Sequence, residues 1–157
     1  MAKTQRDLCN LKKKQAQECP HEVRTCTIDC AQNTLMPHFG DQQPGETHHH
    51  SPVNVHTLGV VNCGSNPMKL HAHTCSEDKA KKGGNNVASL VCTQLFHDGF
   101  LQADRKHVKE SNFAFDNSGS QNKNRMVLRM LLCLARRKVW DVARASLSHQ
   151  GTCQECL

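Results

Sequence analysis

Two short Cys/His clusters carry the residue types that bind transition metals. Cys153-Gln-Glu-Cys156 is a Cys-x-x-Cys pair preceded by His149, and Cys26 and Cys30 form a second pair near the N-terminus. Zinc takes four thiolate or imidazole ligands, which are often supplied as local pairs of this kind. Ten cysteines in 157 residues produce about 0.6 Cys-x-x-Cys pairs by chance, however, so one pair is unremarkable. We therefore expect no resident cofactor, and keep as an alternative a zinc module built from Cys26, Cys30, His149, Cys153 and Cys156.

The net charge of +6 is concentrated in residues 122–147. This segment holds seven Lys and Arg residues and one acid, Asp141, whereas the rest of the chain has equal numbers of basic and acidic residues. Apolar residues recur at i, i+3, i+4 and i+7, which is the spacing of an amphipathic helix. We predict a basic amphipathic helix over 124–147. Its predicted partner-binding residues are Arg125, Leu128, Arg129, Leu131, Leu132, Ala135, Arg136, Arg137, Lys138 and Trp140.

Clustered positive charges on one helix repel each other, and an acidic partner would relieve that repulsion. An acidic protein groove would take bulky anchors such as Val127, Leu134 and Trp140, which stand at 1-8-14 spacing. An anionic membrane surface would accept the apolar face and pair with the arginines. Nucleic acid fits less well, because the helix offers charge without side chains that read bases. The plain alternative is a helix that packs internally and leaves its arginines in solvent.

Motifs of the common enzyme classes are missing from the chain. It contains no Gly-x-Gly-x-x-Gly, no phosphate-binding loop and no Gly-x-Ser-x-Gly. The N-terminus lacks the apolar core of a secretory signal, and no apolar run approaches the roughly 20 residues that span a bilayer. We therefore expect a non-enzymatic, intracellular protein with reduced cysteines, located in the cytoplasm or nucleus and not secreted.

The composition of the chain predicts few helices and strands that could position these residues. Leu, Val, Ile and Phe make up about 20% of the chain, with one Ile, one Trp and no Tyr, which is close to the composition of disordered chains. We therefore expect a mostly irregular or disordered protein with minor α-structure and no globular fold. The first functional interpretation is a small, largely disordered, non-enzymatic protein without a strongly selected biochemical role, and the second is an interaction module that uses helix 124–147.

Local patterns predict three elements. Residues 53–61 and 68–75 alternate in polarity around a turn-rich loop, which predicts a β-hairpin. Residues 87–109 have helical spacing and predict a second, weaker helix. The resulting division of the chain is 1–52 disordered or weakly helical, 53–75 hairpin, 76–86 linker, 87–110 helix, 111–123 linker, 124–147 basic helix and 148–157 a tail that contains cysteines.

Overall fold

The computed structural model describes residues 2–38, 45–47, 49–81, 83–102, 108–116 and 125–148, and these contain one mixed β-sheet and three α-helices. In chain order the elements are α1 (Ala2–Glu18), β1 (Val23–Cys30), β2 (Thr34–Met36), a short 3₁₀ helix η1 (Gly45–Thr47), β3 (Val53–Asn62), β4 (Lys69–Ser76), α2 (Gly84–His97), β5 (Val108–Asp116), α3 (Arg125–Arg136) and β6 (Trp140–Ser148). The expectation of a mostly irregular or disordered protein is therefore wrong.

Strand β1 lies inside the sheet and pairs differently along its two edges. Its Ile28 lies opposite Val60 of the antiparallel β3 and opposite Phe115 of the parallel β5. Beyond β5 the sheet continues with the parallel β6, and β3 also pairs with β4 and β2 in antiparallel fashion. One half of the sheet is thus built from hairpin-like neighbours, while the other half is built from parallel strands that are distant in sequence.

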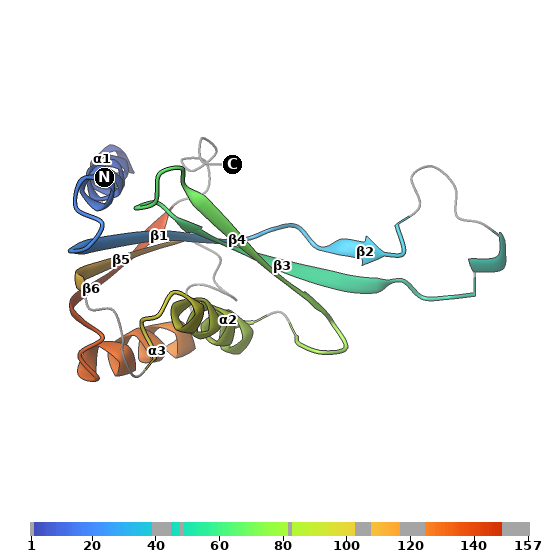
Figure 1. Ribbon diagram of the computed structural model, residues 1–157. Coiled ribbons are helices and arrows are strands. Elements are labelled where there is room, and N and C mark those ends of the chain that lie inside the picture. Colours follow the sequence, from blue (N-terminus) through green and yellow to red (C-terminus); the bar gives the residue numbers. More distant parts are fainter. Residues whose placement is uncertain are drawn as a thin grey trace.

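Helices cover the two faces of this sheet unequally (Figure 1). α2 and α3 lie side by side against one face, and α1 lies on the opposite face. The largest buried side chains belong to the layer between the sheet and the α2–α3 pair: Ile28, Phe113, Phe115 and Trp140 from the strands and Val91, Leu95 and Val127 from the helices. Few apolar residues suffice because they are gathered into this one layer, where burial removes them from water together.

The segment 111–123, expected to be a polar linker, begins with a buried strand. Every side chain from Ser111 to Phe115 in β5 is buried. Phe113 and Phe115 belong to the core beside α2 and α3, whereas Asn112 and Ala114 line the α1 face. Strands of this kind, buried on both faces, have no alternating pattern in the sequence, and their parallel partners are remote.

The helix predicted over 124–147 is half as long as expected. α3 ends at Arg136, and Lys138 takes a left-handed backbone conformation with φ of 52°. Val139 N–H then bonds to Leu134 O at 3.2 Å and Lys138 N–H to Ala135 O at 3.0 Å, which is the Schellman pattern of helix termination. Glycine normally occupies the left-handed position, so a lysine there concealed the stop. The following residues form β6 because they pair with β5 and bury Trp140.

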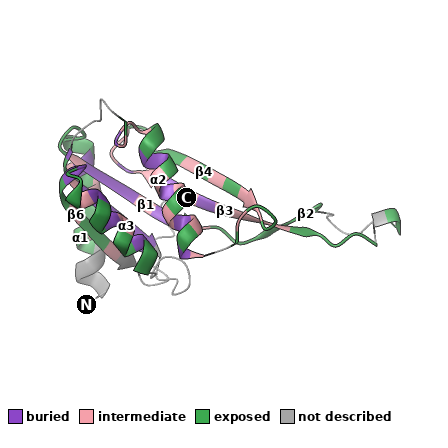
Figure 2. Ribbon diagram, turned by 90° about the horizontal axis from the view of Figure 1, so that it is seen from below, coloured by how far each residue is buried: buried purple, intermediate pink, exposed green. Residues whose placement is uncertain are grey.

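The hairpin predicted within 53–75 is present as β3 and β4, which pair from Val55–Ser76 to Asn62–Lys69. The helix predicted over 87–109 is present as α2, but it ends at His97. Gly99, with φ of 87°, follows in a second Schellman turn, in which Phe100 N–H bonds to Leu95 O. Segment 1–52, expected to be disordered or weakly helical, holds α1 and the buried strand β1 (Figure 2). None of the described helices is long and apolar enough to span a membrane.

Candidate functional site

Helix α3 presents two chemically different faces. Val127, Leu131 and Leu134 are at most 8% exposed and pack into the core. The opposite side, which we name the α3 outer face, consists of the exposed residues Arg125, Leu128, Arg129, Leu132 and Arg136. Leu128 and Leu132 are 52% and 64% exposed, which is unusual for leucines on a packed helix.

The structure separates the predicted partner-binding residues into two groups. Leu131 and Trp140 are buried in the core, and Ala135 is half-buried against it. These three residues are therefore not available to a partner. The remaining predicted residues are exposed on α3 or in the turn that follows it: Arg125, Leu128, Arg129, Leu132, Arg136, Arg137 and Lys138.

The charges of the α3 outer face have no described counter-ions. Among the residues that the structure describes, no carboxylate forms an ion pair with Arg125, Arg129 or Arg136. Arg125 and Arg129 stand at i, i+4, where like charges destabilise a helix by a few tenths of a kcal/mol, roughly 0.2–0.5. Arg136, in the last turn, benefits from the negative end of the helix dipole. The outer face is thus a basic surface with two exposed leucines.

Of the predicted zinc ligands, the structure describes Cys26 and Cys30, and it does not bring these two together. Cys26 is 1% exposed, and burial raises the pKa of its thiol although the nearby Arg24 opposes the shift, so the thiol stays protonated. Cys30 is four residues further along β1, about 13 Å away, whereas two thiolates on one zinc lie within about 4 Å of each other. Positions 149, 153 and 156 lie outside the described residues. Within the described ranges, no group of three or more His, Cys, Asp or Glu side chains is placed to hold a metal ion.

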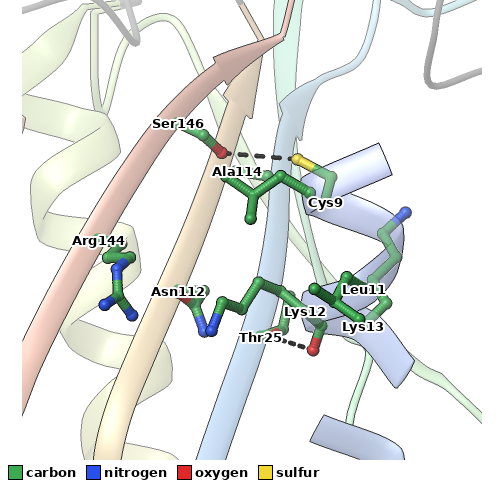
Figure 3. A pocket seen from close by; sticks show the side chains of 10 residues that line it. Cys9, Leu11, Lys12, Lys13, Thr25, Asn112, Ala114, Arg144 and Ser146 are labelled. Carbon is green, nitrogen blue, oxygen red and sulfur yellow. Dashed lines mark hydrogen bonds between the residues drawn. The ribbon is translucent and has the colours of Figure 1, made fainter. Parts of the chain in front are cut away.

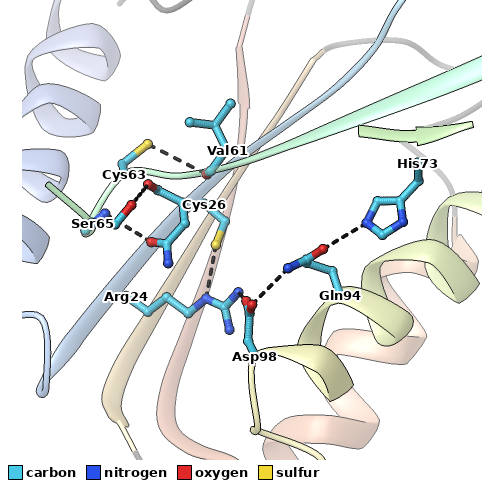
Figure 4. Close-up of polar contacts among 10 residues, drawn as sticks. Arg24, Cys26, Val61, Cys63, Ser65, His73, Gln94 and Asp98 are labelled. Atoms are coloured by element: carbon cyan, nitrogen blue, oxygen red, sulfur yellow. Dashed lines mark hydrogen bonds and ion pairs between the residues drawn. The ribbon is translucent and has the colours of Figure 1, made fainter. Parts of the chain in front are cut away.

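A buried polar network joins β1 to the end of α2 (Figure 4). The guanidinium of Arg24, which is 5% exposed, forms an ion pair with Asp98 and lies 4.3 Å from the centroid of the Phe100 ring. Gln94 Nε2 donates to Asp98 Oδ1 at 2.8 Å, and Gln94 Oε1 accepts from His73 Nε2 at 2.9 Å. Sequence reasoning missed this network because Arg24 and Asp98 are 74 residues apart.

On the opposite face of the sheet, Glu110 of β5 holds two cations. Its carboxylate lies 2.9 Å from Lys12 Nζ of α1 and forms a second ion pair with Arg144 of β6. Burial raises the pKa of Glu110, but the contacts with Arg144 and Lys12 outweigh burial and hold the pKa at about 2. These ion pairs tie α1 to the sheet.

Glu110→Gln should therefore weaken the acid sensitivity of the fold. Because folding lowers the pKa of Glu110 from 4.5 to about 2, the ionised carboxylate stabilises the protein above about pH 4.5, and this contribution is lost as the pH falls toward 2. The free energy of unfolding of the wild type should fall by up to about 3 kcal/mol more than that of the variant over this range. Urea unfolding at stepped pH measures the difference. Glu18→Gln, at an exposed position, should show the same pH dependence as the wild type. If the free energy of unfolding falls equally steeply with pH in the wild type and in Glu110→Gln, the stabilising role of Glu110 is contradicted.

Two neighbouring parallel strands each have an aspartate near the carboxyl end, at the second-last position of β1 and the last position of β5. Because Ile28 lies opposite Phe115, Asp29 and Asp116 follow at the same carboxyl edge of β1 and β5. Asp29 is exposed. The carboxyl ends of parallel strands are where α/β sheets commonly hold ligands. An aspartate directly after apolar residues was the available sequence signal for this edge, but neither segment had been predicted as a strand.

Comparisons with known proteins add little to this geometry. No protein-family model and no curated protein matches the chain. Among solved structures, one similar chain belongs to the crystal structure of the Mos1 Strand Transfer Complex, with 13% sequence identity and a TM-score of 0.37. The alignment covers 94% of this chain and 42% of that chain, so the present chain spans less than half the length of its structural neighbour. A likeness at this level does not assign a function.

Proposed function

We propose that this protein is a non-catalytic interaction module that binds an acidic, leucine-containing protein segment through the α3 outer face. The observation that carries the proposal is the exposure of Leu128 and Leu132 between arginines that have no described counter-ion. Carboxylates of a partner would pair with the arginines, since guanidinium groups match carboxylates with two parallel hydrogen bonds. The two leucines would supply apolar contact area.

The arrangement of the face favours a protein over a membrane. A helix that lies on a bilayer inserts a continuous apolar face and keeps its basic residues at the sides. In α3 that continuous apolar face, formed by Val127, Leu131 and Leu134, already packs into the protein core. The outer face instead has arginines along its length with leucines among them, and this mixed surface matches the rim and core of a protein interface.

The same features favour a protein over nucleic acid. Phosphate groups would pair with Arg125, Arg129 and Arg136 but would leave Leu128 and Leu132 in water. Six of the described cysteines carry free thiols, namely Cys9, Cys19, Cys26, Cys75, Cys92 and Cys133, and this favours a reducing compartment, the cytoplasm or nucleus, for the proposed interaction.

Titration of the full-length protein with a synthetic amphipathic peptide of Glu and Leu residues at i, i+4 spacing tests the proposal. We expect Arg125→Gln/Arg129→Gln/Arg136→Gln to weaken binding at least about tenfold, because three charge-assisted contacts are lost. Leu128→Ser/Leu132→Ser should weaken it by about three- to tenfold through lost apolar contact. Isothermal titration calorimetry measures both effects.

The matched control is Lys69→Gln/Lys79→Gln/Lys81→Gln, which removes three exposed charges from the region of β4 and the turn after it. This control should bind the peptide like the wild type at physiological ionic strength. If it weakens binding as much as the arginine triple variant, total charge explains the affinity and the proposal fails. Tighter binding to phosphatidylserine vesicles or to duplex DNA than to the peptide would likewise overturn it in favour of another class of partner.

A further inference from the structure

A cavity of about 310 Å³ separates helix α1 from the sheet, on the face that α2 and α3 do not cover. α1 contacts the sheet at the rim of this cavity. There Cys9 Sγ lies 3.8 Å from Ser146 Oγ, and Thr25 Oγ1 donates to Lys12 O at 3.0 Å (Figure 3). Between these contacts the strands present small side chains, such as that of Ala114. Helix and sheet therefore remain apart there.

The walls of the cavity combine an apolar side with a cationic side. Leu8 and Leu11 of α1 line it together with Ala114, and both leucines are 51% exposed. Such exposure indicates apolar surface that the protein itself does not cover. A volume of this size lies at the lower end of the range for sites that hold small organic molecules, roughly 300–1,000 Å³.

The cationic side comes from Lys12, Lys13 and Arg144, which also line the cavity. Glu110 is paired with both Lys12 and Arg144, so these two cations exceed their carboxylate by one positive charge. A guanidinium has five N–H donors, and the half-exposed Arg144 retains donors beyond those that one carboxylate can take. A second carboxylate could therefore bind beside Glu110.

We propose that this cavity binds a small amphiphilic carboxylate of the medium-chain fatty acid type. Its hydrocarbon chain would lie against Leu8, Leu11 and Ala114, and its carboxylate would pair with Arg144 and Lys12. Cationic molecules are disfavoured by the excess positive charge. The site lies across the sheet from the α3 outer face, so the inference is independent of the proposed function.

Calorimetric titration of the full-length protein with octanoate, 1-octanol and acetate tests the inference. Octanoate should bind with 1:1 stoichiometry, and acetate, which lacks the chain, should not bind measurably. Arg144→Gln should weaken octanoate binding at least about tenfold, because a charge-assisted hydrogen bond is lost. Octanol should bind more weakly than octanoate and should be insensitive to Arg144→Gln.

Two further variants make the result decisive. Ser146→Leu fills the cavity from the half-buried edge of β6 and leaves its charges in place, so it should abolish octanoate binding while circular dichroism still shows a cooperative unfolding transition. Lys69→Gln, at an exposed position on β4, is the charge control and should bind like the wild type. Absence of octanoate binding, equal affinity for octanol and octanoate, or equal weakening by Lys69→Gln would each overturn the inference.

Discussion

Trp140→Ala should lower the free energy of unfolding by about 3–5 kcal/mol. Trp140 is 1% exposed at the start of β6, and its ring centroid lies 5.4 Å from that of Phe113 in β5. Truncation would leave a cavity in the layer between the sheet and the α2–α3 pair, where neighbouring side chains cannot easily close the gap. Because small domains are stable by only about 5–15 kcal/mol, the substitution should remove a large part of the protein's stability.

Urea unfolding followed by far-ultraviolet circular dichroism measures the effect, since the variant lacks the protein's one tryptophan. Leu132→Ala is the control, because that side chain is 64% exposed on α3 and should change stability by no more than about 0.5 kcal/mol. The two variants together also test whether residues 124–147 form one helix, as the sequence predicts, or α3 followed by β6. On a single exposed helix both substitutions would be nearly neutral, so a small effect of Trp140→Ala would argue against β6.

Asp98→Ala should destabilise the protein by about 3–5 kcal/mol, because it leaves the charge of Arg24 buried without its partner. The Arg24 guanidinium is 5% exposed, and the Asp98 side chain is 18% exposed. Arg24 Nε also donates to the thiol of Cys26 at 3.1 Å, but a neutral thiol cannot compensate a buried cation. The loss should loosen the contact between β1 and the end of α2.

A double-mutant cycle isolates this coupling. Arg24→Met/Asp98→Ala should be less destabilised than the sum of the two single variants by about 1–3 kcal/mol, because removal of both partners leaves no unpaired charge. Asp78→Ala, which breaks the exposed Asp78–Lys79 pair, should leave the stability nearly unchanged, because water screens that pair. Additive effects in the cycle, or equal losses for Asp98→Ala and Asp78→Ala, would contradict the assignment.

The candidate site was predicted in part because its residues are close in sequence. The periodicity of 125–136 correctly indicated a helix with arginines and leucines. It could not show which leucines a neighbour would cover, and so Leu131 was grouped with Leu128 and Leu132. The structure divides them because α3 packs against the sheet and α2 with the ridge of Val127, Leu131 and Leu134.

The boundary between α3 and β6 lay beyond local reasoning for a physical reason. No glycine or proline marks the end of the helix in the segment Arg137, Lys138 and Val139. The apolar residues Trp140 and Val142 then continue a helical pattern. The strand forms because its backbone pairs with β5, which is about 30 residues earlier in the chain. Pairing and burial of the tryptophan together outweigh the small intrinsic preferences of single residues.

Local patterns in the sequence are enough to predict the parts whose cause is local: the β3–β4 hairpin from its alternation, α2 and α3 from their periodicity, and the position of the basic charge. The existence of a core, in contrast, depends on contacts between distant residues. β1 and β5 are polar in sequence, yet their register brings Ile28 beside Phe115 and completes the sheet. Parallel pairing and the collection of sparse aromatic and aliphatic groups into one layer depend on contacts between distant residues, which composition averaged over the chain cannot reveal.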